Sequence, residues 1–323
     1  MNEKIEEICA EIRMLVERAF EKNLTEGILL SGGLDTSILA AVAAKHKQLR
    51  LKAFTCAFQG APAPDVEHAL LMAKKLNLPH YLHFFTEDEL YKAARSVIKV
   101  LRVFDPMEVR NSSTIYIGLN FAKNNGVQSV MTGDALDELM AGYPWLFKLN
   151  EKELELELQK IWDTMFFSSV YVGKAIGVEV KTPYLDPEFK EFAMKLSVKH
   201  KVREERGIKW GKWIMRKAFE DILPAEIAWR RKDPIEVGSG TTTLPNFFST
   251  KISDSEFEEK KKKYLEIDKV TIRDKEQLFY YEIYREEIGV PHPKDPMGKI
   301  CPQCNSNVPE KLNFCRTCGA FPV

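Results

Sequence analysis

Residues 27–37 read Gly27-Ile28-Leu29-Leu30-Ser31-Gly32-Gly33-Leu34-Asp35-Thr36-Ser37, and an Ala-rich segment continues the chain to Ala44. The first part is apolar without polar alternation, which is typical of a strand covered on both faces in a parallel sheet. Paired glycines let backbone N–H groups approach a phosphate chain, and a helix that starts here adds positive potential at its N-terminus. The stretch therefore predicts a buried strand, a phosphate-binding turn and a helix.

The turn also carries side chains suited to phosphate chemistry. Ser31, Thr36 and Ser37 supply hydroxyl donors. Asp35 can hold a magnesium ion that bridges phosphates. The GK[ST] ending of a P-loop and the GxGxxG pattern of a dinucleotide turn are both absent. The alternative interpretation is a strand–helix turn whose glycines serve only to permit positive φ.

Three more strand candidates alternate with helical patterns along the chain, at residues 51–58, 81–85 and 127–131. The last runs directly into a second polar turn, Thr132-Gly133-Asp134-Ala135-Leu136-Asp137-Glu138. Alternating strands and helices predict an α/β fold with a doubly wound parallel sheet. Because ligands bind at the carboxyl ends of the strands in such sheets, we expect the two polar turns to lie together.

The second half of the chain, from about Glu151 onward, is mostly helical in pattern. Lys209, Lys212 and Arg216 recur at helical spacing, which predicts one helix with a basic face directed at the phosphates. A solvated basic face is the alternative. Residues 238–250 are rich in Gly, Ser and Thr and predict a loop.

The composition narrows the class of protein. Forty-seven Lys+Arg balance 47 Asp+Glu, which excludes a strongly basic protein that coats nucleic acid. No apolar stretch approaches the length of a membrane span, about 18 residues, and residues 1–20 are a charged, periodic helix pattern rather than a secretory signal. Six cysteines are too few for a disulfide scaffold of this size. We predict a cytoplasmic protein without a membrane partner.

Four of the six cysteines lie in the last 23 residues, as Cys301-x2-Cys304 and Cys315-x2-Cys318. Two such pairs supply the four thiolates that zinc prefers in closed structural sites. Such a short segment cannot build a core, so zinc binding, worth about 10–16 kcal/mol of apparent affinity, would carry its folding. Two disulfides are the alternative. Four cysteine ligands leave no position for a reactive water, so we predict a structural zinc.

Several ordered motifs resemble the synthetase domain of asparagine synthetases, within the N-type ATP pyrophosphatases, whose pyrophosphate loop is similar to residues 31–37. The further matches, from about residue 10 to 240, are Phe104-Asp105-Pro106 with Val109-Arg110, the 132–138 turn (usually SGEGxDE) with Gly142-Tyr143, Thr182-Pro183-Tyr184-Leu185-Asp186 (PFLD), Lys212-Trp213-Ile214-Met215-Arg216 (KxxLR), and Leu223-Pro224 through Trp229-Arg230-Arg231-Lys232 (LPxxIxxRxK).

The resemblance implies a fold and a reaction. The fold is the adenine nucleotide alpha hydrolase (HUP/PP-loop) sheet, followed by a helical C-terminal half. The small zinc ribbon is predicted from the cysteine spacing alone, since asparagine synthetases do not ordinarily carry one. The reaction is adenylation of aspartate or a related small carboxylate by ATP, with release of pyrophosphate, and then amide formation with ammonia or another amine. The implied ATP- and pyrophosphate-binding residues are Leu30, Ser31, Gly32, Gly33, Asp35, Thr36, Ser37, Cys56, Thr132 and Gly133.

The resemblance also assigns residues to the chemistry itself. Asp35 and Asp137 would hold Mg²⁺, Lys212 would stabilise the leaving pyrophosphate, and Asp137 and Asp134 would complete the catalytic set. Asp134 replaces the family's usual glutamate, a carboxylate thought to guide the amine or the acyl intermediate. Asp186, in the PFLD-like element, is either a site residue or a cap.

The predicted organisation is a synthetase-like domain at 1–290, a Pro-rich linker at 291–299 and a four-cysteine zinc ribbon at 300–323. Residue 2 is Asn, not the Cys of a glutamine-using N-terminal domain, and only about 26 residues precede the first strand. We therefore expect free ammonia, another amine, or ammonia from a separate subunit as the nitrogen source.

Two other functions stay open at this point. One is a tRNA-modifying enzyme of the same superfamily that adenylates a base, with the zinc ribbon docking RNA. The ribbon could also dock a protein partner. Sulfur-transferring members of that class need cysteines near the loop, whereas only Cys9 and Cys56 lie outside the ribbon and they form no CxxC pair. The other is a nucleotide sensor without catalysis, which would not need Asp35, Asp137 and Lys212 together.

Overall fold

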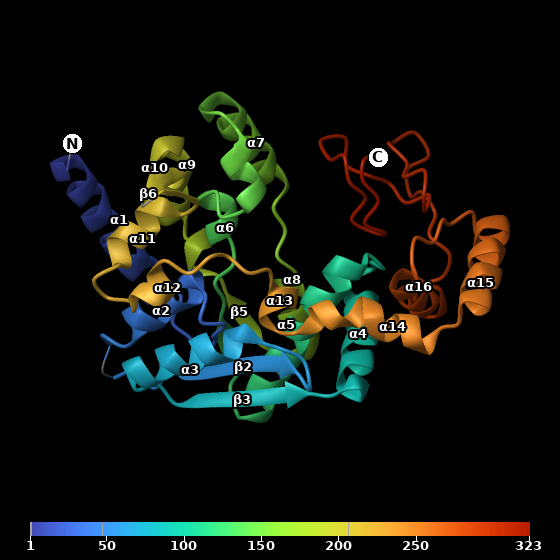
Figure 1. Ribbon diagram of the computed structural model, residues 1–323, viewed down its shortest axis with the longest axis horizontal. Coiled ribbons are helices and arrows are strands. Elements are labelled where there is room, and N and C mark those ends of the chain that lie inside the picture. The colour runs from blue at the N-terminus through green and yellow to red at the C-terminus, as the bar shows by residue number, and fades with distance from the viewer. Residues whose placement is uncertain (1, 47, 206) are drawn as a thin grey trace. The chain divides into compact units, whose positions relative to one another are not determined.

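A computed structural model describes residues 2–46, 48–205 and 207–323 of the chain (Figure 1), with the backbone alone for residues 2 and 3. The described chain forms two compact units, each assembled from segments distant in sequence. The first contains Met1–Cys56, Pro64–His83 and Gly118–Pro234, and the second contains Ala57–Ala63, Phe84–Ile117 and Ile235–Val323. We describe each unit by itself.

A five-stranded sheet forms the framework for the site. Its strands are β1 (Gly27–Leu29), β2 (Lys52–Phe58), β3 (His80–Phe85), β4 (Ser129–Met131) and β5 (Glu179–Lys181), in the order β3-β2-β1-β4-β5. β1 pairs in parallel with both β2 and β4, and β4 pairs in parallel with β5. This order confirms the predicted doubly wound α/β sheet. The strand order reverses between β1 and β4, where such sheets bind ligands.

Helices account for most of the first unit. They are α1 (Asn2–Lys22), α2 (Leu34–Ala43), α3 (Pro64–Leu76), α6 (Leu136–Leu139), α7 (Glu151–Thr164), α8 (Ser168–Ile176), α9 (Pro187–Lys195), α10 (Val198–Lys201), α11 (Trp213–Phe219) and α12 (Ala225–Ala228), with 3-10 turns η1 (Pro144–Lys148) and η2 (Pro183–Leu185). α5 (Pro106–Asn124) has residues in both units.

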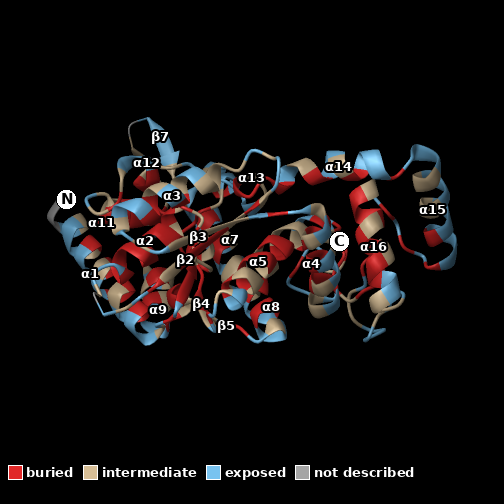
Figure 2. Cartoon of the chain, turned by 90° about the horizontal axis from the view of Figure 1, so that it is seen from below, coloured by how far each residue is buried: buried red, intermediate tan, exposed pale blue. Residues whose placement is uncertain are grey.

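The core of the first unit forms where amphipathic faces meet. α1 contacts α2, α9 and α11, and its Ile12, Val16 and Phe20 are fully buried. Burial of each such side chain contributes about 1.5–3 kcal/mol. Figure 2 shows buried residues concentrated around the strands and the inner faces of the helices. Among the described residues, no helix is long and apolar enough to cross a membrane.

The prediction of one basic helix through Lys209, Lys212 and Arg216 is wrong. Lys209 lies in β7 (Ile208–Trp210), which forms an antiparallel hairpin with β6 (Arg203–Glu205). Lys212 has φ +53°, a left-handed conformation in which an α-helix cannot continue, so α11 begins only at Trp213. The three basic side chains therefore do not share a helical face.

The second unit consists mainly of helices and the Cys-rich tail. Its helices are α4 (Glu87–Leu101), α13 (Ile235–Gly238), η3 (Thr241–Thr243), α14 (Leu244–Lys251), α15 (Asp254–Ile267) and α16 (Lys275–Glu287). The predicted loop at 238–250 is wrong for most of its length. α14 forms there because Pro245 starts a helix well and Phe248 packs on the rings of Phe279 and Tyr280, with centroids 4.8 and 5.6 Å away.

A buried charge on α16 lies at the centre of the second unit. Glu276 is only 4% exposed and pairs with Arg110 at 3.1 Å, while the hydroxyl of Tyr280 donates to it. Burial raises the pKa of Glu276 from 4.5 to about 7, and Arg110 opposes this shift only in part. The folded unit therefore binds a proton at Glu276 at pH values where the unfolded chain releases it.

We predict that this group makes the second unit less stable as the pH rises from 4.5 to 7. The loss from Glu276 should reach at most about 3 kcal/mol, because each pKa unit corresponds to about 1.4 kcal/mol. Glu276→Gln should flatten the pH dependence, and Glu282→Gln on the same helix should preserve it. Urea unfolding at intervals from pH 4.5 to 7.5 measures the slopes. Equal slopes for wild type and Glu276→Gln would contradict the prediction.

Candidate functional site

The two polar turns predicted from the sequence touch each other in the first unit. A Cβ atom on Gly133 would lie 2.9 Å from the Cβ of Asp35 and 3.0 Å from the Cγ2 of Thr36. Only glycine allows the β4 turn to approach the β1 turn this closely. The contact brings the acidic groups of both turns to the carboxyl edge of the sheet.

The β1 turn has the features of a phosphate site. Gly32 has φ +69°, and a Cβ there would lie 2.4 Å from the backbone nitrogen of Ala69. The amide of Gly33 donates to the Ser31 hydroxyl at 3.2 Å, so the turn is held by its own side chains. The Ser37 hydroxyl, at the start of α2, is fully buried and has no hydrogen-bond partner among the described atoms. An unsatisfied hydroxyl at a helix N-terminus suits a phosphate ligand.

Four charged side chains converge beside this turn. The Lys212 ammonium lies 2.6 Å from both carboxylate oxygens of Asp35 and 2.7 Å from Oδ1 of Asp137. Lys232 lies 3.4 Å from Oδ2 of Asp137. Lys212 is only 4% exposed. Two partly exposed carboxylates, the buried ammonium of Lys212 and the partly exposed ammonium of Lys232 therefore form one electrically balanced cluster.

The two carboxylates of this cluster are not equivalent. Burial raises the pKa of Asp35, and Lys212 offsets that effect only in part. Burial would also raise the pKa of Asp137, but Lys212 and Lys232 outweigh it and hold that pKa below its ordinary value. Asp137 is thus the more firmly ionised of the two. Both groups are the hard oxygen ligands that Mg²⁺ prefers, so the pair fits the predicted cation site.

Two glycines make the approach of Lys212 to the acids possible. A Cβ on Gly142 would lie 1.7 Å from Oδ1 of Asp137 and 2.4 Å from Cε of Lys212. A Cβ on Gly211 would lie 2.1 Å from the carbonyl oxygen of Ala141. Gly142 follows the acidic turn in sequence, and the sequence analysis matched the two as one motif without giving Gly142 a role.

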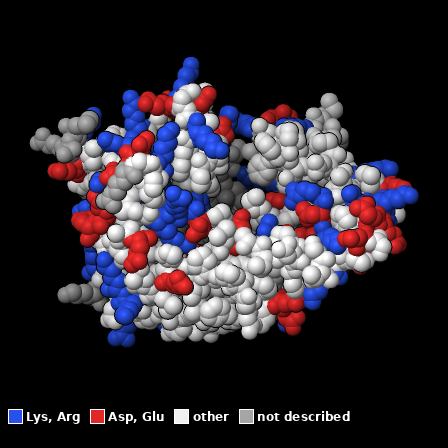
Figure 3. Space-filling view, viewed as in Figure 1, with Lys and Arg blue, Asp and Glu red and all other residues white. Residues whose placement is uncertain are grey.

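The segment after α12 covers the β1 turn and was given no role from the sequence. Arg230 donates to Asp65 at 2.8 Å and to the Ser31 carbonyl at 3.5 Å, and it also pairs with Asp233. Figure 3 shows Lys and Arg atoms gathered on the surface over this segment. Lys232, two residues after Arg230, pairs with Asp137. The segment therefore supplies Arg230, which holds the β1 turn, and Lys232, which belongs to the charged cluster.

Asp134 occupies a different environment from the Lys212 cluster. Its Oδ2 accepts hydrogen bonds from the Thr132 hydroxyl at 2.7 Å and from the Ser169 hydroxyl. Burial raises its pKa, and the two hydroxyls lower it only in part. Ser169 belongs to α8, more than 30 residues away in sequence, so no local motif could have revealed this contact.

The other predicted site residues are held by the sheet or by a helix end. The amides of Leu30 and Thr132 already donate within the sheet, to the carbonyls of Phe54 and Lys181, at 2.8 and 3.0 Å. Cys56 lies within β2, near the end of that strand. Asp186 caps α9 by accepting from the amide of Glu188 at 3.1 Å, which agrees with the cap interpretation.

Arg216 has a structural role. Its guanidinium donates to the carbonyls of Gly211, Ala228 and Arg230 at 3.0, 2.7 and 2.9 Å. Burial lowers its pKa to about 10. It therefore fixes the turn before Lys212 and the segment before Lys232, and in this way it positions both lysines.

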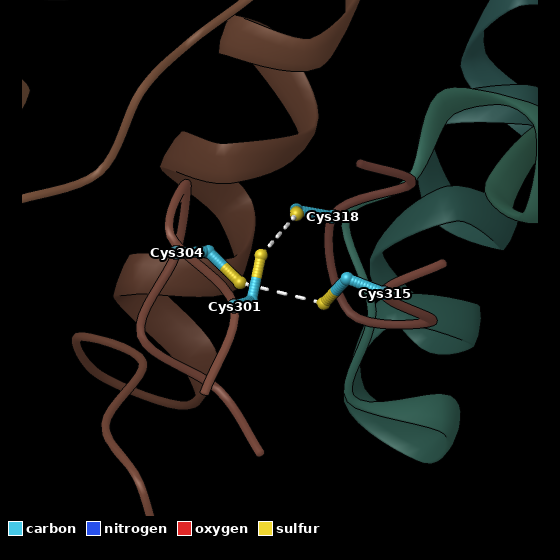
Figure 4. Close-up of side chains that lie close together, drawn as sticks. All are labelled: Cys301, Cys304, Cys315 and Cys318. Carbon is cyan, nitrogen blue, oxygen red and sulfur yellow. Dashed lines mark hydrogen bonds between the residues drawn. The ribbon is translucent and has the colours of Figure 1, made fainter. Parts of the chain in front are cut away.

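In the second unit, the four tail cysteines converge (Figure 4). All are buried, and their sulfur atoms lie within 4.8 Å of one another. The Cys301–Cys318 and Cys304–Cys315 sulfur distances are 3.7 and 3.6 Å. Tetrahedral zinc with bonds of about 2.3 Å separates its sulfur ligands by about 3.8 Å, whereas a disulfide requires about 2 Å. The described cysteines form no disulfide, and this cluster fits the predicted zinc.

Comparison with known proteins identifies relatives. The family model described as asparagine synthase matches residues 10–162 and 151–291. The chain is 30% identical over 306 residues to asparagine synthetase B [glutamine-hydrolyzing] of Escherichia coli (strain K12), covering 87% of this chain and 54% of that protein. It is 32% identical over 250 residues to an asparagine synthetase [glutamine-hydrolyzing] of Zea mays, covering 71% and 42%. The chain spans about half the length of the curated relatives it matches.

Solved structures show a weaker likeness. An NMN synthetase from Francisella tularensis gives a TM-score of 0.31 at 17% identity, covering 59% of this chain and 92% of the other. An NH3-dependent NAD synthetase from Campylobacter jejuni, in complex with the nitrate ion, gives 0.31 at 15% identity, covering 77% and 97%.

We predict that Gly142→Ala disrupts the charged cluster, because the added methyl group would overlap Asp137 and Lys212. Binding of magnesium pyrophosphate should be lost, with a drop in unfolding free energy of about 1–3 kcal/mol. The control Gly126→Ala lies at φ +75° in open space and should cost only about 1–2 kcal/mol of backbone strain while binding is kept. Calorimetric titration distinguishes the two variants. Wild-type binding by Gly142→Ala would refute the assignment.

Proposed function

Because the chain belongs to the asparagine synthase family, we propose that it is an ATP-dependent ligase that forms an amide. A small carboxylate substrate, aspartate or a related compound, attacks the α-phosphorus of ATP and pyrophosphate leaves. Ammonia or another amine then attacks the acyl-adenylate, AMP leaves, and the nitrogen loses a proton. The family match and the geometry of the charged cluster support this proposal.

The observation that carries the proposal is the contact of Lys212 with both Asp35 and Asp137. Each acid comes from a different polar turn, and the two turns meet where the strand order of the sheet reverses. A nucleotide triphosphate bound there would meet ammonium groups for its phosphates and carboxylates for a cation. A sensor without catalysis has no need of such a balanced set of charges.

In this proposal the two turns and the two lysines have different roles in binding ATP and stabilising the leaving group. The amides and hydroxyls of the β1 turn, including Ser31 and Ser37, bind the pyrophosphate part of ATP. Lys212 and Lys232 stabilise the charge that develops on the leaving pyrophosphate. Asp35 and Asp137 would hold Mg²⁺, which neutralises phosphate charge when bound.

We propose that Asp134 acts on the second half of the reaction. A carboxylate beside the acyl group can orient the amine and accept its proton. Ser169 and Thr132 hold the Asp134 side chain in one orientation, so Ser169 is a positioning residue in this scheme.

The remaining assignments are proposals of the same kind. One structural Zn²⁺ occupies the four-cysteine cluster, and the tail serves as a docking module for a protein or tRNA partner. We retain 1–290, 291–299 and 300–323 as proposed modules of the sequence only, since the tail lies within the second compact unit of the fold. Free thiols stay reduced in the cytoplasm, where we expect the protein to act.

The deciding experiment measures pyrophosphate and AMP release from Mg-ATP with aspartate plus ammonium, omitting each component in turn. We expect release to require both the carboxylate and the nitrogen source and asparagine or a related amide to form. A parallel reaction contains total tRNA. Release only with tRNA would refute the ligase proposal and favour a tRNA-modifying enzyme.

We predict that Asp35→Asn lowers pyrophosphate release by about 100-fold or more, because Lys212 and the cation lose a carboxylate partner. The matched control Asp221→Asn removes an exposed carboxylate paired with Arg13 and should keep the wild-type rate. Steady-state rates of the two variants at saturating Mg-ATP test this. Full activity of Asp35→Asn would exclude the cation site.

A further variant separates the two half-reactions. Asp134→Ala should lower amide formation by about 100-fold, as expected for loss of a general base. Carboxylate-dependent exchange of labelled pyrophosphate into ATP should stay within about threefold of wild type, because adenylation does not need this group. Equal losses in both assays would instead give Asp134 a structural role, which circular dichroism of the variant would reveal.

A further inference from the structure

The two CxxC turns of the tail have the same local geometry. The Cys301 amide donates to the Ser306 carbonyl at 2.9 Å, and the Cys315 amide donates to the Ala320 carbonyl at 2.9 Å. In each turn a residue with positive φ follows the second cysteine, Asn305 at +61° and Gly319 at +76°. We call residues 301–306 the first knuckle and residues 315–320 the second knuckle.

The first knuckle is attached to the segment between α15 and α16. The Thr271 amide donates to the Gln303 carbonyl at 2.8 Å, and the Asn305 side chain donates to the Lys269 carbonyl at 3.0 Å. Both bonds join the knuckle to backbone that lies outside any helix or strand. This segment therefore relies on the knuckle to satisfy its hydrogen bonds.

The second knuckle is attached to different parts of the same unit. The Phe104 amide donates to the Thr317 carbonyl at 2.6 Å, and the Gln277 side chain donates to the Cys318 carbonyl at 2.7 Å. Gly319 also packs tightly against Asp105, because a Cβ there would lie 2.2 Å from its Oδ1. Phe104 and Asp105 form the turn immediately before α5.

The elements held by the two knuckles also contact each other. The Phe104 ring lies 5.0 Å from that of Tyr281 and 5.1 Å from that of Tyr284, both on α16. Arg110 of α5 pairs with the buried Glu276 of α16. Asp268, directly before the 269–271 segment, accepts from the Tyr281 hydroxyl of α16 at 2.8 Å. The turn before α5, helix α16 and the 268–271 segment are thus linked as one group through α16, and each knuckle bonds to a different part of it.

We propose that a Zn²⁺ ion bound by the four cysteines links the two knuckles and so holds this group together. The tail is then an integral part of the second unit. Each knuckle supplies two thiolates, and the ion is the shared link between them. Without the ion, four buried thiols have little reason to stay in contact, and each knuckle would separate from the other. The inference rests on the proposed zinc site but is independent of the proposed ligase reaction.

The test uses the full chain as isolated. Metal analysis should find one zinc per chain in wild type and in Cys9→Ser, and none in Cys315→Ser. Chelation of wild-type protein should speed hydrogen exchange at the amides of Phe104 and Thr271 on the order of tenfold or more. Exchange at Thr132, whose amide bonds within the sheet of the first unit, should stay unchanged. Added zinc should restore protection.

One variant separates docking from metal binding. Gln277→Ala keeps all four cysteines but loses the bond to the Cys318 carbonyl and the bond from the Arg273 amide. It should retain zinc and show faster exchange at Phe104. If the amides of Phe104 and Thr271 stay protected after chelation, zinc does not hold the group together and the proposal is wrong. If wild-type protein contains no zinc, the four cysteines are not a zinc site. Pyrophosphate release, measured separately, decides the ligase proposal without bearing on either result.

Discussion

The site depends on the buried ammonium group of Lys212, which lies between the partly exposed carboxylates of Asp35 and Asp137. Removing charges from water costs several kcal/mol per ion, so such a group is stable only when all partners are present. The four members of the cluster come from four segments, namely the turns after β1 and β4, the turn before α11 and the segment after α12. Lys212 adopts φ +53° to reach them, at a cost of about 1–2 kcal/mol. Its amide, which donates to the Met140 carbonyl, helps to hold this conformation.

Several surrounding residues stabilise the contact of Lys212 with Asp35 and Asp137. Glycine at positions 133, 142 and 211 removes the Cβ atoms that would separate the segments. Arg216 ties the turn before Lys212 to the backbone before Lys232. Tyr184 donates to the Asp35 carbonyl at 2.8 Å, which anchors the start of α2. We expect a substitution at any of these positions to change the contacts of Lys212, although none of these residues belongs to the charged cluster.

The sequence predicted the sheet because strand candidates alternate with helical patterns, and the apolar residues 27–30 mark a strand that is buried on both faces. It also identified both acidic turns and the four cysteines, since their spacing is local. It failed where distant contacts decide the structure. The helix expected through Lys209 is a hairpin because Gly211 and Lys212 are held by the acidic turn, and α14 forms in a Ser/Thr-rich segment because Phe248 packs on α16. Ser169 was missed for the same reason, as its partner lies on another element.

Asp134 stands where the motif resemblance leads us to expect a glutamate. A glutamate there would carry its carboxylate one methylene further, whereas Asp134 is short enough for Thr132, two residues before it, and Ser169 on α8 to bind it. Both donors bond to Oδ2, so the orientation of the carboxylate is fixed by the protein rather than by a substrate. In the proposed reaction, an amine that transfers its proton to this carboxylate would therefore approach the backbone of the β4 turn more closely than a glutamate would require. In the proposed reaction this constraint acts on the amine and the acyl group and leaves the ATP-binding turn unaffected.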